Sequence, residues 1–217
     1  MARTTAQWLI KPEDAVLLFL DNQSGLFRLV SDVDEETLRS RVTALAKCAR
    51  LCKTPVIATD SRPDGPNGRL VAAILADNPE AQYIPRTGQI NAWDNPPWRD
   101  AIEKTGRRTL IMVGTLASVC LAQPALSAVT EGYTVYAVFD ASGSSSSIAH
   151  DITLARLVQA GVRPVDTFAV HCELMQTWNR DDAGLFADVI GAYILPAYAA
   201  LDASFQEANN QSQHQKT

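Results

Sequence analysis

Cys120 is the residue whose type and position could supply a nucleophile. It follows a short β-branched run, Thr109 to Val113, and a loop of small residues, Gly114 to Ser118, and it stands where a helical pattern of apolar residues begins. A thiol at the N-terminus of a helix lies near the positive end of the helix dipole, which stabilises the thiolate and lowers the pKa from its usual value of about 8.5. The position predicts an activated cysteine; the alternative is that Cys120 only packs against a sheet.

Two charged residues are placed to assist such a thiol. Asp21 directly follows the apolar run Ala15 to Leu20, and Arg86 follows the strand-like segment Tyr83 to Pro85. Because the carboxyl ends of parallel strands lie along one edge of a sheet, Asp21, Arg86 and Cys120 are expected to meet there. A carboxylate can take the thiol proton, and an arginine favours the thiolate and the anion that follows. The three residues predict a nucleophile, a base and an electrostatic partner; the alternative is that the strand-end charges only cap loops or helices.

The elements that must position these residues alternate between strand and helix patterns. Apolar or β-branched runs of strand length are followed by segments with apolar residues at helical spacing. The predicted strands are 15–20, 55–59, 83–85, 109–113, 134–139 and 165–170. The predicted helices are 34–53, 69–76, 97–105, one that begins at or just before Cys120, 148–160, 173–178 and 185–203. This alternation predicts a doubly wound parallel sheet with helices on both faces.

Composition and charge limit the class of protein. The chain has 217 residues, of which 47% are hydrophobic and 20% are charged, as expected for one compact domain. A formal net charge of −5 without a block of Lys or Arg argues against binding to nucleic acid or to an anionic membrane. The first residues lack the apolar region of a signal peptide, and every apolar run is shorter than the roughly 20 residues of a membrane span, so a cytoplasmic protein is expected.

The other cysteines and the histidines favour structural roles. Cys48 and Cys52 stand one helical turn apart, where a disulfide would be strained, and no cysteine has metal-finger spacing. We therefore expect reduced thiols, with Cys48 and Cys52 packed on a helix face. His150 and His171 are expected to be structural or surface residues.

The segments around the candidate residues resemble the isochorismatase-like cysteine hydrolases, and more closely the YcaC-like branch of that family. The resemblance spans nearly the whole chain. It rests on AVLLFLDNQSGL (15–26), RPDGPNG (62–68), YIPRTGQINAWDN (83–95), LIMVGTLASVCLAQPALSAV (110–129), VFDASG (138–143) and AVHCEL (169–174). It implies a three-layer αβα sandwich around a six-stranded parallel sheet, and a triad of Asp, a basic residue and Cys that breaks non-peptide C–N bonds through a covalent thioester.

Carried over residue by residue, the resemblance places Asp21, Arg86 and Cys120 in the triad. The wider family has Lys where this chain has Arg86; because arginine does not release its proton, Arg86 is expected to stabilise charge and not to transfer protons. The resemblance also implies a non-proline cis peptide, mapped here onto Leu116–Ala117. That peptide would direct the N–H groups of Ala117 and Cys120 at an oxyanion.

Two departures from the family pattern limit what the resemblance implies. Many relatives have Thr and then an acid where this chain has Ala117 and Ser118, so only the backbone part of the oxyanion hole is expected here. The metal-binding branch has Asp-x-His where Asp60 is followed by Ser61 and Arg62, so neither a metal nor another cofactor is expected.

Four residues are predicted to bind the substrate: Phe27, Asn91, Trp93 and Leu116. Their types favour a flat, partly apolar small molecule, and ordinary loop packing is the alternative.

Two functions other than a hydrolase are considered. A nucleotide-binding protein is disfavoured because the sequence has neither G-x-G-x-x-G nor a Walker lysine motif. A ring-forming binding protein with a vestigial triad stays open because of the altered loop at Ala117.

The C-terminal part of the chain predicts assembly. Ile190 to Leu201 carries more apolar residues than one subunit needs to cover its sheet, so a homo-oligomer is expected. The resemblance implies a ring-like octamer of two stacked tetramers, in which loops of a neighbour help to close each active site. The alternative is that this segment folds back on its own subunit. Residues 1–205 are predicted to form the hydrolase domain and residues 206–217 a polar tail.

Overall fold

The fold is built on a central parallel sheet. The computed structural model describes residues 8–214, with side chains from 8 to 208. The strands are β1 (Ala15–Leu20), β2 (Val56–Thr59), β3 (Gln82–Tyr83), β4 (Thr109–Gly114), β5 (Thr134–Val138) and β6 (Arg163–Val165). Their order is β3-β2-β1-β4-β5-β6 and every pairing is parallel, which confirms the predicted six-stranded sheet. The order reverses between β1 and β4, where open α/β sheets place ligands.

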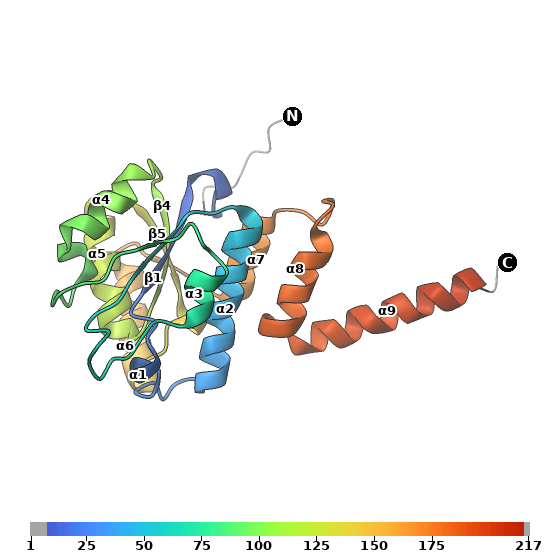
Figure 1. Ribbon diagram of the computed structural model, residues 1–217, viewed down its shortest axis with the longest axis horizontal. Helices are drawn as coiled ribbons and strands as arrows, with labels where there is room; N and C mark the ends of the chain where they lie inside the picture. The colour runs from blue at the N-terminus through green and yellow to red at the C-terminus, as the bar shows by residue number, and fades with distance from the viewer. Residues whose placement is uncertain (1–7, 215–217) are drawn as a thin grey trace.

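Helices cover both faces of the sheet, which confirms the three-layer prediction (Figure 1). They are α1 (Ser24–Phe27), α2 (Glu35–Cys52), α3 (Ala72–Ala76), α4 (Pro96–Lys104), α5 (Ala122–Thr130), α6 (Ser147–Gln159), α7 (Thr167–Met175), α8 (Ala183–Val189) and α9 (Pro196–His214). Short helical turns are η1 (Pro12–Asp14), η2 (Ala92–Asp94), η3 (Ala117–Leu121), η4 (Phe139–Ala141) and η5 (Ile190–Ile194). Helices α2, α3 and α7 pack on one face, and α4, α5 and α6 pack on the other. No helix in this part of the chain is both long and apolar enough to span a membrane.

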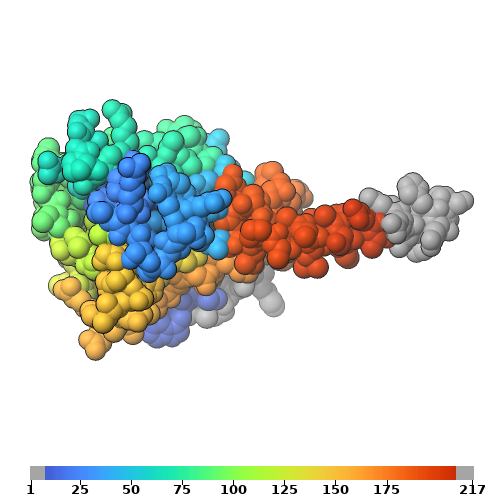
Figure 2. Space-filling view, turned by 90° about the horizontal axis from the view of Figure 1, so that it is seen from below, coloured from blue at the N-terminus to red at the C-terminus, as the bar shows by residue number. Residues whose placement is uncertain are grey.

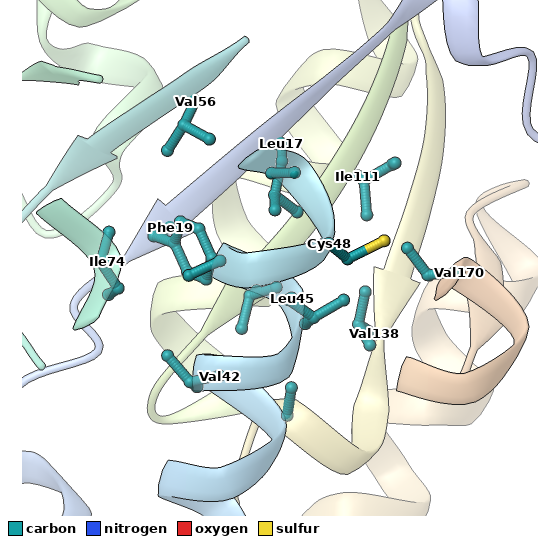
Figure 3. Close-up of a cluster of buried hydrophobic side chains, with 14 of the residues drawn as sticks. Leu17, Phe19, Val42, Leu45, Cys48, Val56, Ile74, Ile111, Val138 and Val170 are labelled. Carbon is teal, nitrogen blue, oxygen red and sulfur yellow. The ribbon is translucent and has the colours of Figure 1, made fainter. Parts of the chain in front are cut away.

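The core on the α2 face fixes the central strand. Val42, Leu45 and Cys48 of α2 face Leu17 and Phe19 of β1, and all five are buried (Figure 3). Burying each large apolar side chain stabilises the fold by about 1.5–3 kcal/mol. The packing of Cys48 on the inner face of α2 confirms its predicted structural role. This layer holds β1 in place, and with it the polar residues that follow β1.

The last strand is shorter than predicted. Residues 163–165 form β6, and Thr167 already begins α7, where a strand through Val170 was predicted. The reason is Asp166, whose carboxylate accepts a hydrogen bond of 2.8 Å from the Ala169 N–H and caps the helix. The cap makes the apolar residues that follow helical, although their composition is typical of a strand.

Helix α9 leaves the globular body as a single arm (Figures 1 and 2). Ile190 and Ile194, just before it, are buried against Ala44 of α2, which is the packing on the own subunit that the alternative predicted. Farther along the helix the large apolar side chains are exposed: Leu201 is 66% exposed and Phe205 is 61% exposed. The helix continues to residue 214, so residues 206–214 of the predicted polar tail are helical.

Candidate active site

Asp21, Arg86 and Cys120 come together at the carboxyl edge of the sheet. Asp21 follows β1, Arg86 follows β3, and Cys120 lies in the π-helical turn η3 that leads into α5. Arg86 Nη2 lies 2.6 Å from Asp21 Oδ2, and the two side chains are 1% and 2% exposed. The negative charge of Asp21 in turn raises the pKa of the Cys120 thiol. The arrangement places a buried ion pair beside a thiol.

Asp21 is held in an unusual backbone conformation. Its φ of 55° lies in the left-handed region, which costs a non-glycine residue on the order of 1 kcal/mol. The conformation is maintained by the neighbouring strand, because the Asp21 N–H donates to the Thr59 carbonyl at 3.0 Å. Such backbone outliers cluster at functional sites, where the surrounding structure holds them.

Arg86 is held as a fixed positive charge. Besides the ion pair with Asp21, its Nη1 donates to Thr59 Oγ1 at 3.1 Å and its Nε donates to the Gln89 carbonyl at 3.0 Å. Its backbone N–H donates to the Asp60 carbonyl at 2.9 Å, which continues the pairing of β2 with β3. With three side-chain donors engaged, the guanidinium is pre-organised to stabilise negative charge.

The Cys120 thiol is less acidic than its helix position predicted. Burial raises the pKa of Cys120 well above its usual value, and the charge of Asp21 and a hydrogen bond to Asp21 raise it further. The charge of Arg86 and the backbone of Leu116 lower the pKa by less. The predicted lowering by the helix dipole is therefore wrong for the resting site. A protonated thiol needs a base, and Asp21 Oδ1 is a buried oxygen without a conventional hydrogen-bond donor among the described residues.

The loop before the nucleophile differs from its predicted register by one residue. The cis peptide joins Thr115 to Leu116, not Leu116 to Ala117. The Ala117 N–H donates to the Gly143 carbonyl at 2.9 Å, and the Cys120 N–H donates to the Leu116 carbonyl at 2.8 Å. Both predicted oxyanion donors are thus engaged, whereas the Leu116 N–H has no acceptor within the part of the chain that the structure describes. Residue types alone do not distinguish neighbouring peptides in such a loop.

Gly114 allows the chain to return sharply from β4 into η3. A Cβ at this position would lie 2.8 Å from the Leu121 nitrogen and 3.0 Å from the Cys120 carbonyl carbon. Only glycine lets these backbones approach so closely. The Gly114 N–H also donates to Ser142 Oγ at 3.0 Å, which ties the end of β4 to the loop after β5.

Asp60 is a site-adjacent residue that was not predicted as functional. It is 1% exposed, its Oδ2 accepts a hydrogen bond of 2.7 Å from the Tyr83 hydroxyl, and its Oδ1 has no donor among the described residues. Burial raises the pKa of Asp60, and the nearby charge of Asp21 adds to this. The signal that could have found it is the one that found Asp21, a carboxylate directly after an apolar strand.

The predicted substrate-binding residues divide between the site and the core. Leu116 is half-buried in the loop before Cys120. Phe27 is 1% exposed and packs in the core cluster under α2. Asn91 donates to Ser127 Oγ at 3.1 Å, and Trp93 Nε1 donates to Glu131 at 2.8 Å. The contacts of Asn91 and Trp93 lie toward the C-terminal end of α5, away from the thiol.

The residues of the site offer no metal-binding set. No group of three or more His, Cys, Asp or Glu side chains in the described residues is arranged to hold a metal ion. His150 instead pairs with Asp32 at 3.0 Å, and His171 is fully buried against the Phe186 ring.

The fold is an all-parallel α/β sheet with a buried ion pair and a cysteine at its carboxyl edge, and the comparisons identify the family to which it belongs. Residues 15–168 match the isochorismatase domain, so the chain belongs to the isochorismatase family. It is 40% identical over 198 residues to the probable hydrolase YcaC of Escherichia coli (strain K12), covering 91% of this chain and 94% of that protein.

Solved structures agree with this assignment. YcaC from Pseudomonas aeruginosa, determined with hexane-2,5-diol and covalent acrylamide, is 41% identical with a TM-score of 0.89, covering 94% of this chain and all (100%) of that chain. The Escherichia coli YcaC structure, described as an octameric hydrolase of unknown specificity, is 40% identical with the same TM-score of 0.89 and the same coverage, 94% and 100%.

Proposed function

We propose that this protein is a metal-independent cysteine hydrolase that cleaves a non-peptide C–N bond, such as an amide, of a small molecule through a thioester on Cys120. The observation that carries the proposal is the state of Asp21. One carboxylate oxygen is held by Arg86 at 2.6 Å, and the other is buried without a conventional donor while the carboxylate acts on a protonated thiol. A base placed in this way is suited to take the thiol proton as the sulfur attacks.

The reaction then follows in two halves. Cys120 Sγ forms a bond to the carbonyl carbon, its proton passes to Asp21, and the carbonyl π electrons move to the oxygen. The intermediate collapses as Asp21 returns the proton to the nitrogen, the C–N bond breaks and the amine leaves. Water next attacks the thioester and gives its proton to Asp21. Asp21 protonates the departing sulfur, which releases the acid and restores the thiol.

The oxyanion is proposed to bind at the Leu116 N–H. This donor has no acceptor in the described part of the chain, whereas the Ala117 N–H is bound to Gly143. The fixed positive charge of Arg86, which lies next to Asp21, favours the anionic intermediate. Arg86 itself does not transfer a proton. One backbone donor of this kind is worth about 100- to 1,000-fold in rate.

A relative supports the reactive thiol. YcaC from Pseudomonas aeruginosa was determined with covalent acrylamide. Acrylamide is an electrophile that thiols attack, and we propose that Cys120 of this chain reacts with it in the same way.

The test is turnover on a panel of small amides together with acrylamide labelling and peptide mapping. We expect Cys120→Ser to abolish both turnover and the label at this position. Cys172→Ser is the matched control, because Cys172 is exposed and its variant should keep both. Turnover that survives in Cys120→Ser would contradict the proposal.

Asp21→Asn separates acidity from catalysis. Removing the negative charge lowers the pKa of Cys120, so labelling should begin at a lower pH than in the wild type. Turnover should nevertheless fall by at least about 100-fold, because the amide cannot accept the proton. A variant that labels at the wild-type pH and turns over normally would rule out Asp21 as the base.

A catalytically vestigial binding protein is the second candidate. The engaged N–H groups of Ala117 and Cys120 favour it, because neither is free to bind an oxyanion in this conformation. Binding of an amide without any product on the same panel would support it over the hydrolase.

We also propose that the chain forms a homo-oligomer, and an octamer in particular, because Escherichia coli YcaC is described as octameric and the bare α9 arm needs a partner.

A further inference from the structure

The base of the α9 arm is held rigidly by its own subunit. Arg41 Nη1 donates to the carbonyls of Tyr193 and Ile194, both at 2.6 Å, at the end of η5. Gly191 packs so closely that a Cβ there would lie 2.9 Å from the Cβ of Ala199 in α9. These contacts fix the direction in which the arm leaves the globular body, so the fold itself determines the orientation of α9.

Beyond its base the arm carries an apolar seam along one side. Tyr198, Leu201, Phe205 and Ala208 follow one another at intervals of three, four and three residues, so they share one side of the helix. Leu201, Phe205 and Ala208 are exposed, and Tyr198 is half-buried by stacking on Trp178 at 6.3 Å between ring centroids. A seam with this spacing is typical of a helix that packs lengthwise on another element.

A hollow of about 420 Å³ lies beside the base of the arm. It opens between α2 and α8 and is lined by apolar parts of Leu51, Leu185, Val189 and Tyr193. Leu185 is 53% exposed there. Helix α9 runs away from the globular body of its own chain (Figures 1 and 2), so another segment must fill the hollow if it is an interface.

The charges select between two partners for the seam. Asp202 and Glu207 are the charged residues between 196 and 208, so two α9 arms packed together would gather four acids without a cation. Arg50 lines the hollow, is exposed and forms no ion pair among the described residues. Asp188 is an acid that also lines the hollow. The second cation of the hollow, Lys47, already pairs with Asp77 at 3.0 Å. The charge balance favours the hollow over a second arm.

We propose that α9 of each subunit lays its seam in the hollow between α2 and α8 of a second copy of this chain, in a reciprocal exchange. Because η5 both forms one wall of the hollow and carries the arm, a two-fold axis beside η5 brings each arm to the other copy's hollow. The inference rests on the proposed homo-oligomer and is independent of the proposed chemistry at Cys120.

The first test is light scattering of the full chain. Leu201→Asp combined with Phe205→Asp should at least halve the mass of the assembly, while circular dichroism and acrylamide labelling of Cys120 are kept. Ala203→Asp is the matched control, because Ala203 is exposed about half a turn from the seam and should leave the mass unchanged. An unchanged mass in the double variant, or an equal fall in the control, overturns the proposal. Retained labelling separates this outcome from failure at the active site.

The second test identifies the acceptor. Chains with photoreactive benzoylphenylalanine in place of Phe205 are assembled with ¹⁵N-labelled wild-type chains and irradiated. We expect cross-links from the unlabelled residue to ¹⁵N-labelled peptides of α2 or α8. Cross-links to a second α9, or only within one chain, would overturn the exchange.

Discussion

Asp60 is a buried acid beside the proposed active site, and its charge affects the stability of the fold. It lies next to the ion pair of Asp21 and Arg86, and the Tyr83 hydroxyl satisfies one of its two oxygens. Because its pKa is raised in the folded protein, the folded state holds the proton of Asp60 to a higher pH than the unfolded state does. Its contribution to stability is therefore favourable in acid and is lost as the pH rises through the folded pKa.

We expect Asp60→Asn to raise the melting temperature above that of the wild type at pH 8. At pH 4 the difference between the variant and the wild type should be smaller. Asparagine keeps an acceptor for Tyr83 and carries no charge that must be buried. Differential scanning fluorimetry at the two pH values measures the change. Asp64→Asn is the control, because the Asp64 side chain is 94% exposed and should give no such difference. A stabilisation equal at both pH values would show that charge is not the cause.

His171 is a second buried titratable group, remote from the site. It is fully buried between α7 and α8, and burial lowers its pKa to about 4. The unfolded chain takes up a proton near the usual pKa of about 6.5, whereas the folded chain does not. Stability is therefore lost as the pH falls from about 6.5 to about 4, by about 3 kcal/mol in all.

His171→Phe should flatten this acid loss, because phenylalanine keeps the ring contact with Phe186 and cannot be protonated. Urea unfolding at pH 7 and pH 4.5 compares the free energies. His150→Gln serves as the control, since it leaves His171 in place and should retain the fall. If His171→Phe loses stability in acid as steeply as the wild type, carboxylates elsewhere are responsible.

At the scale of single residues the sequence predicted positions better than properties. Asp21, Arg86 and Cys120 follow strands, and parallel strands must end on one edge, so their meeting could be expected. The acidity of Cys120 could not, because burial and the charge of Asp21 depend on tertiary packing and outweigh the helix dipole. The free donor at Leu116 was missed for a similar reason, since the partners of a loop N–H depend on the tertiary packing around the loop.

The connection between β4 and η3 is the element on which the nucleophile depends. Gly114 ends the strand where the backbone of residues 120 and 121 passes within about van der Waals contact of it. The backbone there has no room for a side chain. The position of the Cys120 thiol is therefore set by the end of β4 and by the single turn that follows it.

Gly114→Ala should destabilise the fold by about 2–3 kcal/mol and displace Cys120, because the added Cβ would lie 2.8 Å from a backbone nitrogen. Thermal unfolding and acrylamide labelling measure the two effects. Gly184→Ala is the matched control: a Cβ at Gly184 in α8 meets nothing within 4 Å, and alanine favours a helix. Equal effects of the two variants would refute the role of the close approach.

Most elements could be predicted because buried parallel strands are continuous apolar runs and their crossover helices are amphipathic. The exception at β6 and α7 shows the limit of that rule. Residues 165–170 have a strand-like composition, and one capping carboxylate, Asp166, makes most of them helical. Local hydrogen bonds of this kind compete with composition, and their outcome depends on where the preceding strand ends.

At the scale of the whole molecule the chain divides into a packed body and a bare arm. The apolar segment from residue 190 was predicted either to meet a partner or to fold back, and the two parts of it do different things. Ile190 and Ile194 are buried in their own subunit, whereas Leu201 and Phe205 face outward. Sequence pattern alone could not separate them, because both parts are rich in apolar residues.

If the seam is buried between copies, folding and association are coupled. Raising the subunit concentration a hundredfold then adds about 2.7 kcal/mol to the stability of each pair, or about 1.4 kcal/mol per chain, which should raise the melting temperature by about 3–5 °C. The double variant Leu201→Asp with Phe205→Asp should lose this dependence, and Ala203→Asp should keep it. Calorimetry across the concentration range decides the point, since a wild-type melting temperature that does not change with concentration would mean that the arm is not held by a partner when the chain unfolds.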